Sequence, residues 1–187
     1  GALYLYNNMG KKSVTIDWTE PEGMAALRDL IGTADVLIDD WTSRTRQSLS
    51  LQQSELGTLN DSLIDLSMTP FGLDGPYAEW LSTPLVSLAL GGYLYLSGSE
   101  SREPLMLPGH QSQYLAALQG YAGIMLALRA RDETGSGQAV EVSEMESLVS
   151  LHQFTIVSQT YDGIVRRRAG VRLARGGSIG GYPITTL

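Results

Sequence analysis

Short apolar runs alternate, along the first third of the chain, with stretches whose apolar residues recur at helical spacing. Residues 14–18 alternate apolar and polar positions, which is typical of a strand. Residues 34–39 and 62–67 are short apolar runs of the kind found in buried parallel strands. Residues 21–31 and 51–59 carry their apolar positions on one helical face. This order of strands and helices predicts an α/β fold with a parallel sheet and right-handed crossovers.

The second half of the sequence predicts long apolar helices. After a turn-rich loop at residues 71–77, residues 84–96 indicate a buried helix with a short extension. Residues 114–131 are apolar nearly all round, so we expect a helix that is buried on most of its sides. Residues 140–142 indicate a short strand, and the basic, Gly-rich tail at 166–187 indicates an extended connector.

Residues at the expected helix ends support these boundaries. Pro21 stands in the first turn of its helix, and Gly32 stands where a C-terminal cap belongs. Ser143 is followed three residues later by Glu146, which is a capping box. We expect it to begin a helix that runs to about Tyr161.

Composition narrows the classes of function. The net charge of −7 argues against nucleic acid or an anionic membrane as the main partner. The absence of cysteine excludes a thiol nucleophile and thiolate metal sites, and the presence of only two histidines argues against a zinc site. Since no apolar run reaches the roughly 18 residues that span a bilayer, and no signal peptide is visible, the sequence predicts a cytoplasmic protein without a metal.

Five segments match, in order, the motifs of one enzyme family. They are Asn8–Asp17, Pro21–Gly23, Ala34–Trp41, Phe71–Tyr77 and Arg131–Gln138. In this order and at this spacing they resemble the family III CoA-transferases, a group that includes formyl-CoA transferase, carnitine CoA-transferase and α-methylacyl-CoA racemase. The resemblance covers most of the chain.

The resemblance implies a particular architecture. It implies an α/β fold with a Rossmann-like parallel sheet core, long extended helices and an interlocked homodimer, which would cover the apolar helix at 114–131. Compared with full-length members, the sequence lacks the first βαβ unit and the smaller second domain, so we expect a fragment. Residues 1–163 would form the central part of the large CoA-transferase domain, and residues 164–187 the connector toward the small domain.

The resemblance also places a nucleotide site at two strand ends, where open α/β sheets bind ligands. The residues implied to line the nucleotide of CoA are Ile16, Asp17, Trp18, Thr19, Asp40, Trp41 and Thr42. For the two aspartates the alternative is a strand-end residue that caps a neighbouring loop. Ser48 stands where family members often have an arginine, and Arg44 or Arg46 could substitute for it.

Gln113 stands at the position that the family gives to its nucleophile. Counting back from Thr134 without a gap, the nucleophilic Asp of the family falls on Gln113. A carboxylate attacks an acyl-CoA thioester to form a mixed anhydride, but a neutral amide is a poor nucleophile. Gln113 could hold or polarise a carbonyl, or it could satisfy backbone groups at the turn. We interpret His110 as a bystander and His152 as a packing residue within a helix.

Three hypotheses about function follow from the resemblance. The first is a CoA-transferase that moves CoA between an acyl-CoA thioester and a small carboxylic acid, with the missing carboxylate supplied from elsewhere. The second is a catalytically silent CoA-binding or dimerisation domain. The third is an acyl-CoA lyase or dehydratase that uses Gln113 only for orientation. In each of them CoA or acyl-CoA is a substrate or ligand, and no cofactor is bound permanently.

Overall fold

A three-stranded parallel sheet forms the centre of the molecule. In this computed structural model, which describes residues 1–170, 172–173 and 182–183, the strand order is β1 (Val36–Asp39), β2 (Ile64–Thr69), β3 (Gln138–Ser143). Val36 pairs with Ile64, and Ile64 pairs with Gln138. The three strands therefore begin at one edge, and the expectation of an α/β fold with a parallel sheet is confirmed.

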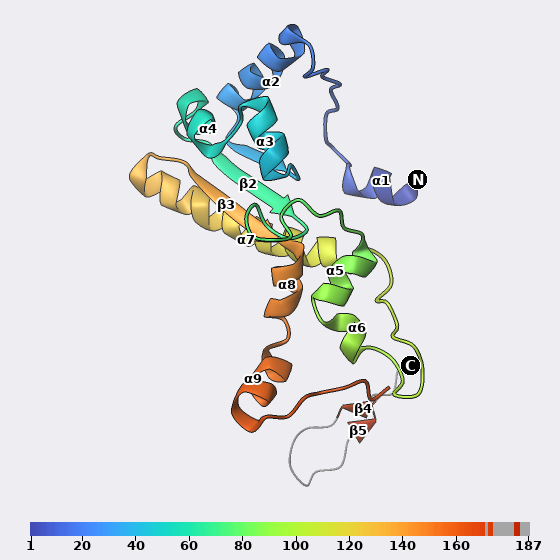
Figure 1. Cartoon of the computed structure of the whole chain (residues 1–187). Coiled ribbons are helices and arrows are strands. Elements are labelled where there is room, and N and C mark those ends of the chain that lie inside the picture. The colour runs from blue at the N-terminus through green and yellow to red at the C-terminus, as the bar shows by residue number, and fades with distance from the viewer. Residues whose placement is uncertain (171, 174–181, 184–187) are drawn as a thin grey trace.

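Helices flank the sheet and continue below it (Figure 1). The helices before β2 are α1 (Ala2–Asn7), α2 (Pro21–Thr33), α3 (Ser43–Leu49) and α4 (Gln53–Leu59). Those after it are α5 (Pro84–Leu90), α6 (Tyr93–Leu96), α7 (Gln111–Thr134), α8 (Glu144–Ser150) and α9 (Gln153–Asp162). In the tail, β4 (Arg172–Leu173) pairs antiparallel with β5 (Tyr182–Pro183). Residues 171, 174–181 and 184–187 of the expected connector lie outside the described residues.

Two apolar clusters hold these elements together. Around β1, the first cluster contains the buried residues Ile31, Leu51, Leu56 and Leu63. The second cluster joins α7 to the sheet through Leu66, Ala116 and Val142. Small residues on α7 allow its backbone to approach the strands, since a Cβ on Gly120 would lie 2.9 Å from Leu66.

The outer face of α7 is exposed in this chain. Its buried residues are Ser112, Ala116, Gly120 and Ala127, whereas Leu118 and Leu126 are 66% and 72% exposed. The expectation that this helix is buried on most of its sides is therefore wrong for the single chain. The apolar residues on the two faces have different surroundings, and only one face packs on the sheet.

Two further expectations are wrong near the N-terminus. Residues 14–18 form no strand, because no described strand lies alongside them to accept or donate ladder hydrogen bonds. Gly32 lies inside α2 and does not cap it, since the helix runs on to Thr33 and the capping residue is Ala34.

The expected helices at 84–96 and 144–161 are each interrupted. Gly92, at φ 85°, separates α5 from α6, and Leu151 and His152 separate α8 from α9. The expected start at Ser143 is confirmed, because its hydroxyl accepts a hydrogen bond from the Glu146 backbone N–H at 3.3 Å. The helix α3 is an element that the hydrophobic pattern did not predict.

Gly137 is required where the turn after α7 enters β3. Its N–H donates to Asp61 O at 2.8 Å, and a Cβ would lie 2.1 Å from Leu63 O. We expect Gly137→Ala to lower the free energy of unfolding by roughly 2 kcal/mol, because backbone must move to relieve the clash. Urea unfolding of the full-length protein measures this change as a lower midpoint.

Gly57→Ala is the matched control for this change. Gly57 lies inside α4, and a Cβ there meets nothing within 4 Å. Alanine is therefore expected to raise the free energy of unfolding by about 0.5–1 kcal/mol. Equal midpoints for the two variants would contradict the steric argument.

Candidate functional site

The first expected ligand segment, residues 16–19, forms a tight polar turn ahead of α2. The Asp17 carboxylate accepts hydrogen bonds from the Thr19 hydroxyl at 2.6 Å and from the Thr19 N–H at 3.0 Å. These bonds lower the pKa of Asp17. Gly23 lets the turn lie against the helix, because a Cβ there would be 1.9 Å from Asp17 O.

Two tryptophans bring the two expected segments together. The rings of Trp18 and Trp41 meet edge to face, with centroids 6.1 Å apart and planes at 81°. Trp18 is 44% exposed and Trp41 is half-buried. Residues 16–19 and 40–42, which are separated in sequence by all of α2 and β1, are therefore neighbours in the fold.

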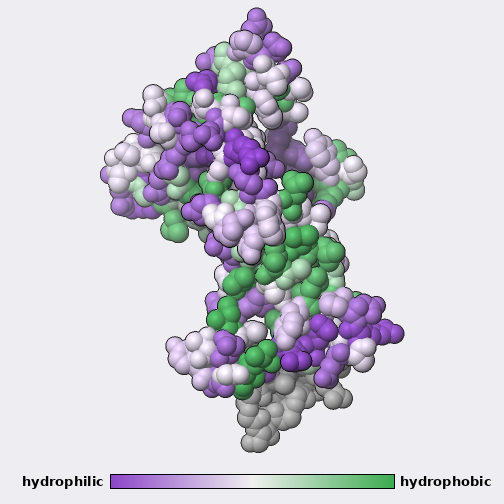
Figure 2. Space-filling view, in the orientation of Figure 1, coloured by the Kyte–Doolittle hydropathy of each residue, from purple (hydrophilic) through white to green (hydrophobic). Residues whose placement is uncertain are grey.

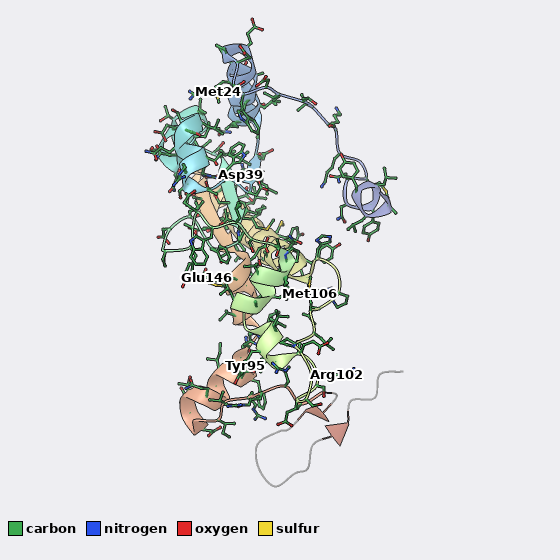
Figure 3. The ribbon with its side chains drawn as sticks, turned by 45° about the vertical axis from the view of Figure 1, so that its right-hand side comes forward. Met24, Asp39, Tyr95, Arg102, Met106 and Glu146 are labelled. Atoms are coloured by element: carbon green, nitrogen blue, oxygen red, sulfur yellow. The ribbon has the colours of Figure 1, made fainter. Side chains whose placement is uncertain are left out.

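The second segment is a turn between β1 and α3. The Asp39 carboxylate accepts from the Trp41 N–H at 3.0 Å, and the Thr42 hydroxyl caps α3 by accepting from the Thr45 N–H at 3.3 Å. Asp40 is exposed. Asp39 is the last residue of β1, and Figure 3 shows it in the upper half of the molecule, whereas Tyr95 and Arg102 lie in the lower half.

A buried charge cluster, formed by Arg46, Asp39 and Asp65, lies under this turn. The Arg46 guanidinium donates to the two Asp65 oxygens at 2.8 and 2.7 Å and also contacts both oxygens of Asp39. Burial alone would lower the pKa of Arg46, but its hydrogen bonds to Asp65 and Asp39 outweigh burial and raise it. Burial raises the pKa of Asp39, and Arg46 offsets only part of that effect.

The sequence analysis did not predict this buried charge cluster. Arg46 was a candidate to replace the missing basic residue toward CoA, but it is only 4% exposed and its donors face the two aspartates. Arg44 is the more accessible of the two candidates, with a side chain that is 82% exposed and a nitrogen 4.0 Å from Glu79. The sequence did contain a signal for the cluster, because Asp39 and Asp65 lie at the end of or within apolar strands. Two buried carboxylates require a buried cation.

Two cavities lie near the expected site. A groove of about 860 Å³ runs between residues 14–17 and α2, and the carboxylates Asp17, Glu20, Glu22 and Asp29 make it acidic. A polar cleft of about 420 Å³ lies over β2 and β3, with Arg46, Asp65, Ser67 and Glu141 among its lining residues.

The loop at residues 71–77 closes one side of the polar cleft. Glu141 accepts from the Leu73 N–H at 2.7 Å, and Thr69 accepts from the Gly72 N–H at 2.9 Å. Ser43, at the start of α3, donates to Leu73 O. The loop is therefore fixed to β2, to β3 and to the helix that follows the second ligand segment.

Gln113 lies in the first turn of α7, and its side chain bonds within that turn. Its Oε1 is 2.9 Å from His110 Nδ1. Because an amide oxygen only accepts, His110 Nδ1 is the donor, and the two amide N–H groups of Gln113 are those available to an outside acceptor. The structure thus joins His110 to Gln113, which the sequence did not predict.

His152 packs between helices, as expected, although it lies at the junction of α8 and α9 and not inside one helix. Its Nε2 is 2.8 Å from Gly91 O, and its ring lies 4.4 Å from the ring of Tyr93. Burial raises the pKa of Tyr93. Within the described ranges there is no group of three potential metal ligands and no helix long and apolar enough to cross a membrane.

Comparison with known proteins gives concordant matches. The family model described as CoA-transferase family III matches residues 1–185. The chain is 31% identical over 167 residues to succinyl-CoA:(R)-benzylsuccinate CoA-transferase subunit BbsE of Thauera aromatica, covering 89% of this chain and 41% of that protein. It is 33% identical over 147 residues to the succinyl-CoA–L-malate CoA-transferase beta subunit of Chloroflexus aurantiacus, covering 78% and 36%.

A solved structure has the same arrangement of elements. The crystal structure of a CAIB/BAIF family protein from Brucella suis superposes with a TM-score of 0.82 at 28% identity, covering 86% of this chain and 43% of that one. The chain thus spans about two fifths of the length of the proteins that it matches.

Proposed function

Because the chain belongs to CoA-transferase family III, we propose that it binds coenzyme A and takes part in moving CoA from an acyl-CoA thioester to a small carboxylic acid. The observation that carries the proposal is the Trp18–Trp41 contact, which joins the two segments implied to line the nucleotide. The relatives named above act on succinyl-CoA, so succinyl-CoA is the first donor to test. The proposed compartment is the cytoplasm.

The proposed role of Gln113 is to hold the substrate and not to attack it. His110 fixes the amide oxygen, so the amide N–H groups can donate to an acyl carbonyl. The carboxylate nucleophile would come from a second chain or a second half of the same fold. Two of the relatives are named as subunits, which supports an assembly of this kind.

The exposed face of α7 supports a partner chain of the same family. The exposed apolar residues of α7 include Tyr114, Leu118, Tyr121 and Met125. Their spacing of four, three and four residues forms one stripe along the helix. Figure 2 shows that hydrophobic residues also gather at the narrow middle of the molecule, where α5 lies. We propose that a second family III chain covers these residues, as in an interlocked dimer.

A silent CoA-binding or dimerisation domain is the second candidate. It is favoured by Gln113, since its neutral side chain bonds to its own turn. Both candidates require CoA binding, but only the first requires turnover once the partner carboxylate is present.

Calorimetric titration of the full-length protein with CoA tests what the two candidates share. We expect saturable binding with one CoA per nucleotide site, and lower affinity for a Trp18→Ala variant because the paired rings are lost. The matched control is Trp80→Ala. Trp80 is an exposed tryptophan that follows the loop at residues 71–77, and its ring contacts Tyr77. The absence of CoA binding by the unmodified protein would overturn the proposed ligand.

A further inference from the structure

The turn that carries three of the expected nucleotide residues rests on a buried cation. Arg46 is 4% exposed, and its backbone N–H bonds to Thr42 O at 2.9 Å, so α3 places it directly beneath the turn. A charged group removed from water is tolerated only when its donors are paired. Its pairs with Asp39 and Asp65 therefore fix the position of the guanidinium.

Asp39 connects this cation to the turn. One carboxylate oxygen of Asp39 accepts both from Arg46 Nε at 3.4 Å and from the Trp41 N–H at 3.0 Å. The ring of Trp41 in turn contacts the ring of Trp18. A displacement of the guanidinium would move the carboxylate, and the Trp41 backbone would move with it.

We propose that Arg46 is a positioning residue for the nucleotide of CoA, which acts through Asp39 to hold the Asp40–Thr42 turn against Trp18. This inference rests on the proposed function, because it assumes that the turn binds CoA. In this role Arg46 supports the turn from beneath, and its side chain bonds to Asp39 and Asp65.

The guanidinium group is essential to this role because of its shape. Arg46 bonds to two carboxylates, one at the end of β1 (Asp39) and one within β2 (Asp65). A planar fork of donors can satisfy both at once, whereas a lysine ammonium is a point charge on a flexible stem. Arg46→Lys therefore keeps the buried charge while releasing the geometry of Asp39.

The test is calorimetric titration of the full-length protein and its variants with CoA, together with near-ultraviolet circular dichroism of the tryptophans. We expect Arg46→Lys to raise Kd by about tenfold at unchanged stoichiometry and to alter the tryptophan signal. Gln47→Lys, the control at an exposed position of the same helix, is expected to leave the tryptophan signal unchanged and Kd within about twofold. A lower stoichiometry at unchanged Kd would mean that Arg46 serves folding alone, and would overturn the inference.

A double-mutant cycle tests the route through Asp39. Asp39→Ala removes the acceptor of both Arg46 and the Trp41 N–H, so it should weaken CoA binding at least as much as Arg46→Lys. If Arg46 acts through Asp39, adding Arg46→Lys to Asp39→Ala has little further effect on Kd. Additive losses of CoA affinity in the double variant, or an unchanged Kd in the single variants, would overturn this inference and leave the proposed function standing. Failure of the unmodified protein to bind CoA would overturn the proposed function, and this inference with it.

Discussion

A Gln113→Asp variant is expected to raise label exchange between succinyl-CoA and succinate at least about 100-fold over the unmodified chain, a change of about 2.7 kcal/mol in barrier height. The aspartate would attack the thioester carbonyl, form a mixed anhydride and release CoA as its thiolate. Gln113 is half-buried in the first turn of α7, where the free backbone N–H groups of the helix stabilise negative charge. The measurement is the rate at which labelled succinate enters succinyl-CoA, with mass spectrometry to identify an acyl adduct on the α7 peptide.

Gln111→Asp is the control for the added charge. Gln111 is also half-buried, and it lies two residues earlier in the same turn of α7. It therefore receives a similar electrostatic benefit from the helix terminus but does not occupy the implied nucleophile position. Equal exchange by the two variants would contradict the assignment of Gln113. Exchange by the unmodified chain, without either substitution, would mean that another carboxylate of the same protein serves as nucleophile.

The elements that sequence reasoning located are those whose pattern reflects burial in this chain. β1 and β2 are apolar runs between polar turns, and both were predicted within two residues of their bounds. The start of α8 was predicted because the Ser143 cap is a local hydrogen bond that needs no partner from elsewhere in the fold. Such features can be derived from neighbouring residues alone.

Three of the errors have the opposite cause, since they depend on contacts with residues that are not neighbours in the sequence. Residues 14–18 have the alternation of a strand, but a strand forms only where another strand pairs with it. The apolar character of α7 predicted burial, but its outer face has no cover within the described part of this chain. The polar sequence of α3 gave no helical pattern, because this helix is fixed by the Thr42 cap and by the ion pairs of Arg46.

The candidate site shows the same division. The resemblance named Trp18 and Trp41 separately, and the structure places their rings in contact. Neither motif spacing nor periodicity could predict that contact, which depends on how α2 crosses back to the sheet. The nucleotide and catalytic roles of these residues and of Gln113 remain predictions, and the experiments above test them.

Removing the buried cation is expected to have the largest effect on stability. Arg46→Met would leave Asp39 and Asp65 buried without a counter-charge, and we expect a loss of roughly 3–5 kcal/mol in the free energy of unfolding at pH 7. Urea unfolding of the full-length protein gives this value from the midpoint and slope. Arg44→Met, at an exposed position of the same helix, is expected to change it by less than about 0.5 kcal/mol.

The pH dependence of this loss identifies its cause. Burial already raises the pKa of Asp39, and Arg46 is the main group that lowers it, so removal of Arg46 raises the folded-state pKa further. A carboxyl whose pKa is raised on folding contributes stability that is complete below its unfolded pKa and is lost as pH rises through its folded pKa. The Arg46→Met variant should therefore recover stability relative to the unmodified protein between pH 7 and pH 5. A loss of the same size at both pH values would show that lost packing of the arginine side chain, and not the uncompensated charge of Asp39, is responsible.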